Sequence, residues 1–357
     1  LNAITMPEFL RARYGSKALQ IIGALVMFVF LVPYSASVYM GLSYLFQKTL
    51  GLEYSTALIF LAILTGVYLV MGGYFAVAIS DFVRGFVEFF GVLILVFVLA
   101  AHWGGGIVKS AHTMIAEPSY APGLLASVPL GPAGLQLVIP GAVTLMALVL
   151  ITSFGPWALP QMVQKFYSIR SKADVTRAMT IAAVFALFMS FGAYFSGALT
   201  HFAPFEITKT KEILFDGQLI AQATRAGNPD WDIIMPHFIT HSGLPVALVL
   251  IILLMVFSAS MSSLSSLVLV SSSAIAIDIY GAFVNRTANE KQTMALLRGL
   301  CAVFVGASLA IALLRPIYIV NLMVISWGTL AGVFLAPFLY GLFWKRTTLA
   351  GVFAGVL

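Results

Sequence analysis

The chain has 357 residues, of which 61% are hydrophobic and only 9% are charged. Because a soluble domain carries about 25% charged residues and must present them to water, this composition excludes a soluble enzyme, a disordered regulator and a nucleic-acid-binding module. The net charge of +6 comes from only 19 Lys and Arg residues, which is more typical of membrane orientation than of an acidic partner. The single cysteine, Cys301, excludes an internal disulfide.

Eight apolar stretches are long enough to cross a bilayer as helices, which takes about 20 residues each. The predicted spans are 18–46, 54–73, 81–103, 135–159, 177–201, 244–277, 295–314 and 317–343, with a partial helix from 348. The sixth span is too long for one bilayer crossing, so it must tilt, break or extend beyond the membrane. We expect residues 1–357 to form a single, incomplete transmembrane domain without a signal peptide.

The basic residues divide unevenly between the two sides of the membrane. With eight spans, one set of loops holds 13 of the 19: Arg11, Arg13, Lys17, Arg84, Lys165, Arg170, Lys172, Arg177, Arg286, Lys291, Arg298, Lys345 and Arg346. The positive-inside rule assigns this set to the cytoplasm, so we expect residue 1 on the cytoplasmic side of the cell membrane. The long loops 104–134 and 203–243 then lie outside, and the segment from Asp232 predicts a short helix there.

Asp81 opens the third predicted span, and Arg84 and Glu88 follow it on the same helix face. An ionisable residue at membrane depth is costly and usually functional. Two other interpretations stay open, since Asp81 also fits a helix N-cap and Arg84 also fits its neutralising partner.

The fourth span ends in Ser153-Phe-Gly-Pro-Trp-Ala-Leu-Pro-Gln161. Two prolines and a glycine predict a broken helix, and broken helices expose backbone groups that line substrate and ion sites in transporters. A simple helix exit is the alternative. Asn321 and Ser326 place polar side chains in the last complete span.

Nine serines lie within residues 258–273 of the sixth span. Helical spacing places four residues on one face, with Ser265 beside them: Ala259, Ser262, Ser263 and Ser266. Hydroxyl oxygens are hard ligands that suit a hard cation such as sodium. The alternative is close helix packing, because small residues also line membrane helix interfaces.

Patterns of other chemistries are absent from the sequence. His237 and His241 lack the adjacent Glu of a zinc hydrolase motif, and there is no P-loop, Gly-x-Ser-x-Gly or dinucleotide fingerprint. We therefore expect no enzyme, no metal other than sodium, no organic cofactor and no nucleic-acid partner.

Five segments in order along the chain resemble the sodium:solute symporter family. They are Ile4-Thr-Met-Pro-Glu-Phe-Leu10, Gly72-Gly-Tyr-Phe-Ala-Val-Ala-Ile-Ser-Asp81, Ala259-Ser-Met-Ser-Ser263, Asp278-Ile-Tyr280 and Gly341-Leu-Phe-Trp-Lys-Arg-Thr347. Members of the family that transport sugars place a lysine in the helix that corresponds to 178–200, and this chain has none there. The chain is therefore more similar to the proline, pantothenate and monocarboxylate branch than to the sugar branch.

The resemblance implies an all-α integral membrane protein with a leucine-transporter-like core of five plus five helices in inverted repeat. The fragment would cover core helices three to ten and the start of the eleventh. The implied function is sodium-coupled secondary active symport of a small organic solute, with a monocarboxylate or an amino acid favoured. The alternative is a transporter-like membrane sensor domain of a signalling kinase, and a passive channel is a third option.

The resemblance also implies three groups of site residues. The main sodium site would use the Ala259 carbonyl and the Ser262 and Ser263 hydroxyls. A second sodium site would use Asp81, Ser262, Ser265 and Ser266, although Arg84 stands where the family often has Gln and would compete with sodium. The substrate site and its gate would include Ser153, Pro156, Trp157, Gln161 and Asn321.

Overall fold

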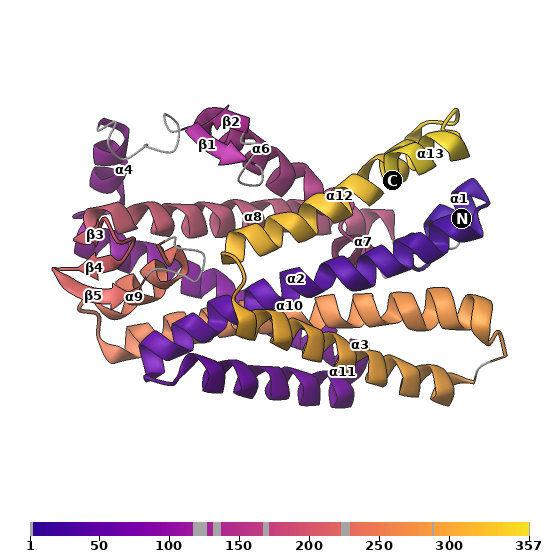
Figure 1. Ribbon diagram of the computed structural model, residues 1–357, viewed down its shortest axis with the longest axis horizontal. Helices are drawn as coiled ribbons and strands as arrows, with labels where there is room; N and C mark the ends of the chain where they lie inside the picture. The colour runs from indigo at the N-terminus through magenta and orange to yellow at the C-terminus, as the bar shows by residue number, and fades with distance from the viewer. Residues whose placement is uncertain are drawn as a thin grey trace.

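The computed structural model describes residues 3–116, 127–130, 137–166, 171–222, 229–287 and 289–356. Seven helices within these residues are long and apolar enough to cross a membrane, and a shorter apolar helix covers Tyr54–Leu69. The seven are Lys17–Leu50, Ile79–Trp103, Leu145–Lys165, Ala173–Phe202, Val246–Val284, Glu290–Leu314 and Ile319–Phe343. The architecture is therefore a bundle of membrane-length helices, seen from the side in Figure 1.

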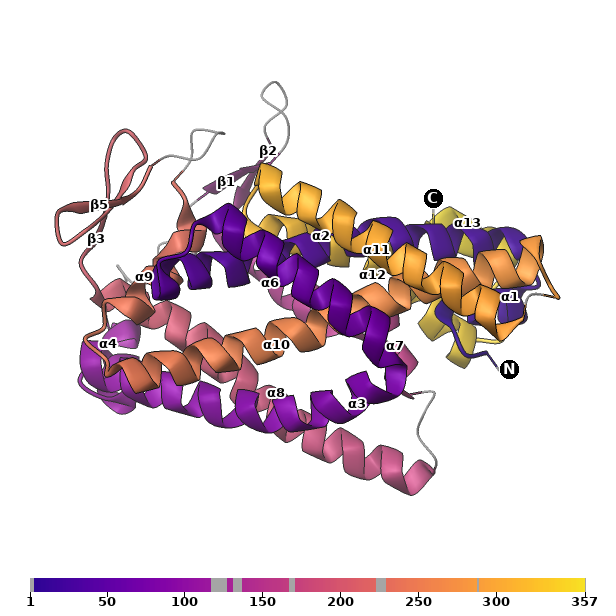
Figure 2. The same cartoon turned by 90° about the horizontal axis from the view of Figure 1, so that it is seen from below.

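The first part of the chain forms four helices: α1 (Met6–Tyr14), α2 (Lys17–Leu50), α3 (Tyr54–Trp103) and α4 (Ile107–Ala116). Helices were predicted at 54–73 and 81–103, and the apolar stretches Tyr54–Leu69 and Ile79–Trp103 correspond to them, although helical structure continues between the two. Figure 2 shows the ribbon of α3 running out and then back, so one helical element supplies two arms.

The middle of the chain contains β1 (Ser127–Leu130), β2 (Leu137–Pro140), α6 (Gly141–Phe154), η2 (Gly155–Trp157), α7 (Pro160–Phe166) and α8 (Lys172–Leu199). A helix was predicted from residue 135, but Leu137–Pro140 pair with β1 as an antiparallel strand. The β-branched pair Val138-Ile139 favours a strand, and Pro140 cannot donate the hydrogen bond that a helix interior needs. The predicted helix break is present as the 3-10 turn η2.

The last part begins with η3 (Thr200–Phe202), the three-stranded sheet β3 (Phe205–Ile207), β4 (Ile213–Phe215) and β5 (Gln218–Ala221), η4 (Trp231–Ile233) and α9 (Ile234–Thr240). It continues with α10 (Val246–Ser273), the π-helix η5 (Ala274–Val284), α11 (Glu290–Leu314), α12 (Ile319–Phe343) and α13 (Leu349–Val356). The short helix predicted near Asp232 is thus present. The overlong sixth span resolves by extension, since α10 runs on into η5.

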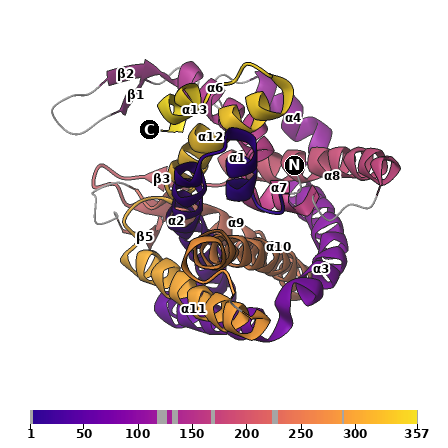
Figure 3. The ribbon, with the colours of Figure 1, turned by 90° about the vertical axis from the view of Figure 1, so that its right-hand side faces the viewer.

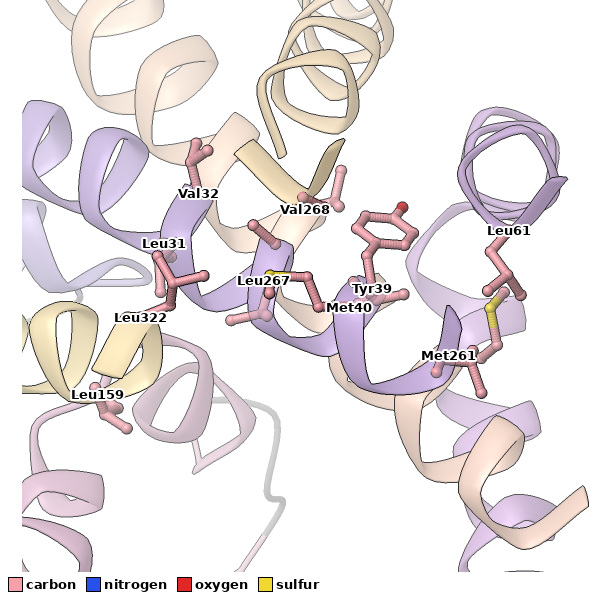
Figure 4. Close-up of a cluster of buried hydrophobic side chains, with 14 of the residues drawn as sticks. Leu31, Val32, Tyr39, Met40, Leu61, Leu159, Met261, Leu267, Val268 and Leu322 are labelled. Atoms are coloured by element: carbon pink, nitrogen blue, oxygen red, sulfur yellow. The ribbon is translucent and has the colours of Figure 1, made fainter. Parts of the chain in front are cut away.

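Helix α2 lies at the centre of the bundle and packs against α3, α10, α11 and α12. Figure 4 shows side chains of α2, among them Leu31 and Met40, in one buried cluster with Leu267 of α10 and Leu322 of α12. Three serines on the surrounding helices donate hydrogen bonds to backbone carbonyls of α2: Ser271 to Met27, Ser308 to Val32 and Ser326 to Phe30. These carbonyls lie in the turns that precede Pro33, which has no backbone N–H and so interrupts the helical hydrogen-bond ladder of α2.

The two ends of the bundle differ in structure (Figure 1). Helices α1 and α13 and the link from η5 to α11 lie at one end, whereas α4, α9 and the strands β3 to β5 lie at the other. These elements belong to the two sets of loops that the distribution of basic residues separates.

Close approach of α3 and α10 depends on Gly91. A methyl group at this position would lie 2.5 Å from Met255 Cβ, whereas nothing lies within 4 Å of one at Gly85 in the same helix. We expect Gly91→Ala to destabilise the fold by about 1–3 kcal/mol, because the two helices must separate. Thermal unfolding in detergent checks this, with Gly85→Ala as the control. Equal melting temperatures for the two variants would contradict the packing described here.

Candidate functional site

A cavity of about 410 Å³ opens between α2, the η4–α9 segment, α10 and the start of α12. Its wall is mostly apolar. Its polar lining residues are Tyr34, Ser37, Asp232, Ser260 and Ser263. A largely apolar pocket with a few polar groups is the usual form of a binding site for a small molecule, and this volume fits a small organic solute.

Two residues of the predicted main sodium site, Ala259 and Ser263, line this cavity one helical turn apart on α10. Ser262 lies about 100° around the helix from Ser263 and does not line the cavity. The Ser265 hydroxyl is buried and donates to the Ser262 carbonyl at 2.9 Å. The structure therefore brings part of the predicted ligand set to the cavity and leaves the other hydroxyls on the neighbouring face.

Asp232 is the charged residue of the cavity wall, and it was not predicted as a site residue. Its Oδ2 atom accepts a hydrogen bond at 3.0 Å from the backbone N–H of Ile319, the first residue of α12. Burial raises the pKa of Asp232 to about 6. The sequence feature that could have identified Asp232 is the pair of aspartates on either side of Trp231. The other one, Asp230, accepts a hydrogen bond from the Tyr44 hydroxyl at 3.2 Å.

Asp81 lies in a network of cations. Arg84 is 3.5 Å and Lys165 is 3.7 Å from its carboxylate oxygens. The Arg84 guanidinium also lies over the Tyr68 ring, 5.1 Å from its centre. Among the described residues, no hydrogen bond joins Asp81 to the serines of α10. The geometry thus gives Asp81 the neutralising partner that was one of its alternatives.

The helix break does not place its predicted residues in the cavity. Ser153 and Trp157 are exposed, and Asn321 is exposed on α12. Gln161 differs, because it is only 4% exposed and neither atom of its amide has a hydrogen-bond partner among the described residues. Buried amides are normally bonded, so Gln161 is the residue of this group that is suited to meet a ligand.

A second buried polar site lies in η5, beyond the end of α10. The Asp278 carboxylate accepts hydrogen bonds from Thr5 at 2.7 Å and from Gln20 at 3.1 Å. Thr5 and Asp278 belong to segments that carried the family resemblance, but their contact, 273 residues apart in sequence, was not predicted. Gln20 gave no separate signal.

The paired histidines form a stacked contact rather than a ligand cluster. The rings of His237 and His241 are 3.7 Å apart, and burial lowers the pKa of His237 to about 4. Within the described part of the chain, no three residues among His, Cys, Asp and Glu come together in a way that could hold a metal ion.

Comparison with known proteins identifies a family and several relatives of this chain. The model of the "Sodium:solute symporter family" matches residues 1–357. The "High-affinity proline transporter PutP" of Bacillus subtilis is 27% identical over 364 residues, covering 100% of this chain and 69% of that protein. The "Sodium/proline symporter" of Haemophilus influenzae is 27% identical over 371 residues, covering 100% of this chain and 66% of its own. The "Sodium/pantothenate symporter" of Escherichia coli is 25% identical over 368 residues, covering 100% and 67%.

A solved structure shares the fold. It is the substrate-bound outward-open state of a Na+-coupled sialic acid symporter, with a TM-score of 0.72 and 19% identity. The match covers 97% of this chain and 67% of that one. This chain therefore spans about two thirds of the length of these relatives.

The raised pKa of Asp232 gives a pH-dependent stability. Because its folded pKa of about 6 exceeds the ordinary value of 3.8, the stability from its protonated form is full below pH 3.8 and is lost as the pH rises through 6. Asp232→Asn keeps an acceptor for Ile319 but cannot ionise. We expect its melting temperature to match the wild type near pH 4 and to exceed it by a few degrees above pH 6. A difference that is the same at both pH values would contradict the ionisation cost.

Proposed function

The chain belongs to the sodium:solute symporter family, and on this premise we propose that it is part of a transporter that couples uptake of a small organic solute to inward sodium flow. The observation that carries the proposal is the cavity, which joins the predicted sodium ligands Ala259 and Ser263 to a space of solute size. One wall would thus serve both the ion and the solute, so that binding of one can change the affinity for the other.

Sodium would supply the driving force. A monovalent cation that crosses the membrane along the potential releases about 2.3 kcal/mol per 100 mV. Binding to the Ala259 carbonyl and the Ser262 and Ser263 hydroxyls would favour the outward-open state, provided that this state binds the ion better. Ser262 would reach the ion after a rotation of α10, because it does not line the cavity in this structure.

The solute is a monocarboxylate or an amino acid in this proposal. Support comes from the cavity volume and from the relatives, which are named for proline and pantothenate. Asp232 favours the amino acid of these two classes, because a carboxylate in the wall attracts an ammonium group and repels an anion. No organic cofactor enters this mechanism.

The proposed orientation places residue 1 on the cytoplasmic side of the cell membrane, with residues 1–357 inside one transporter domain. Alternating access would then open the cavity at the α9 end for loading and at the α1 end for release (Figure 1). The break at Gly155–Trp157 is where the α6–α7 segment would bend during this change.

Removal of a sodium ligand should reduce transport through sodium affinity. In vesicles that contain the full-length protein, we expect Ser262→Ala and Ser263→Ala each to raise the sodium concentration for half-maximal proline uptake at least about tenfold, because hard oxygen ligands set the affinity. Ser271→Ala is the matched control, since its hydroxyl lies on the same helix but bonds to α2. Unchanged sodium dependence in both ligand variants would contradict the site, and sodium-independent uptake by the wild type would contradict the proposed coupling.

The second sodium site gives a separate prediction. If Asp81 exchanges Arg84 and Lys165 for sodium during transport, the wild-type Hill coefficient for sodium exceeds 1, and Asp81→Asn lowers it toward about 1. Asp174→Asn, at an exposed position of α8, is the control. A wild-type Hill coefficient of about 1 would contradict the second sodium site and would mean that Asp81 stays paired with Arg84 and Lys165 during transport.

A further inference from the structure

Helix α4 and the end of α3 form a groove of about 700 Å³ that shares no residue with the cavity of the candidate site. The membrane-length part of α3 ends at Trp103, and only three residues separate it from the start of α4. Tryptophan is typical of the boundary between the hydrocarbon and the headgroups of a bilayer. The groove therefore lies at the level of a membrane surface.

Helix α4 lies on the outer side of the bundle at this surface. In Figure 1 it runs across the direction of the long helices, at the end that also holds the strands β3 to β5. Figure 3, which looks along the bundle, shows α4 apart from the central helices α2 and α10. This position brings α4 beside the headgroups of the surrounding lipids.

The turn between α3 and α4 depends on glycine. Gly105 and Gly106 have φ angles of 68° and 114°, which glycine adopts at no steric cost. A methyl group on Gly105 would lie 3.2 Å from the Cδ atom of Lys109 and 3.3 Å from its Nζ atom. The Lys109 side chain thus folds back over the turn, so its ammonium group lies close to the point where α3 ends.

The groove has an apolar wall and a basic edge. Phe97 and Ala101 of α3, which lie one helical turn apart, and Val108 of α4 supply the apolar surface. Lys109 and His112 supply N–H donors one turn apart on α4. The described lining contains no acidic residue, and neither of these two side chains forms an ion pair with a described residue. An anion with an apolar tail complements both parts of this surface.

The exposed face of α4 also combines apolar and basic side chains. Val108 and Ile115 lie on the face that carries His112, and they are 83% and 85% exposed. Both lie outside the membrane-length helices, so water would cover them if α4 stood clear of the bilayer. Such a combination on one helix is typical of a helix that lies in the membrane interface.

We propose that the groove binds one glycerophospholipid with a net negative headgroup. Its phosphate accepts hydrogen bonds from Lys109 and His112, and one acyl chain lies along Phe97 and Ala101. The apolar wall favours a lipid over a free phosphate ion, because a phosphate ion gains nothing from apolar surface. The inference goes beyond the proposed function, since the groove has no residue in common with the ion or solute site.

Native mass spectrometry of the purified full-length protein in detergent, titrated with phosphatidylglycerol, tests the proposal. We expect the wild type to bind one phosphatidylglycerol more tightly than any further ones. Lys109→Gln should weaken this tight binding about fivefold, because one basic residue near an anionic lipid surface contributes about this much. Adding His112→Gln should weaken it further. Lys209→Gln is the control, since Lys209 is an exposed loop residue that does not line the groove.

Two further arms separate a lipid from a free phosphate. Phe97→Ala should weaken the tight binding about threefold, because the acyl chain loses apolar contact. Soluble glycerol phosphate should not displace phosphatidylglycerol, because it has no acyl chain. Displacement by glycerol phosphate would overturn the assignment to a lipid.

Equal phosphatidylglycerol binding by the wild type and by the variant that lacks both Lys109 and His112 would overturn the proposal and would leave annular lipid only. The substituted side chains are all exposed, so we expect the variants to fold. Equal melting temperatures in lipid-free detergent check this. The titration contains neither sodium nor solute, so its outcome is independent of the proposed function.

Discussion

The requirement that every backbone polar group within a bilayer has a partner shapes this bundle, and α2 is where it acts most clearly. Pro33 interrupts the hydrogen-bond ladder of α2 near its middle. Serines from α10, α11 and α12 donate to carbonyls in the turns before this interruption, so three helices are tied to one. Apolar contact alone gives little preference between helices in lipid, whereas these polar contacts select which helices lie beside α2.

Because α2 holds α10 in place, both polar sites of α10 have fixed surroundings. At one level Ala259 and Ser263 face α2 across the cavity, and Asp232 closes the wall by capping α12. At the far end Asp278 accepts hydrogen bonds from Thr5, the N-cap residue of α1, and from Gln20 of α2. The continuous helical segment of α10 and η5 thus runs from the cavity to the buried Asp278.

The departures from prediction have local physical reasons. Charge placement located the two arms of α3, and the structure joins them as one helical element that folds back. Hydropathy included Leu137–Pro140 in a span because strands and helices of apolar residues have the same composition. The break at Gly155–Trp157 was predictable, because proline and glycine act through local backbone geometry.

The sequence by itself determined the membrane class, the number of apolar helical segments, the helix break and the serine-rich helix, since each depends on composition or on spacing within one element. Only the tertiary structure decided which polar groups meet. It paired Asp81 with Lys165, placed Asp232 in the cavity wall and joined Thr5 to Asp278 across 273 residues. Contacts of this kind depend on how distant helices pack, and no local pattern encodes the identity of a partner that lies elsewhere in the chain.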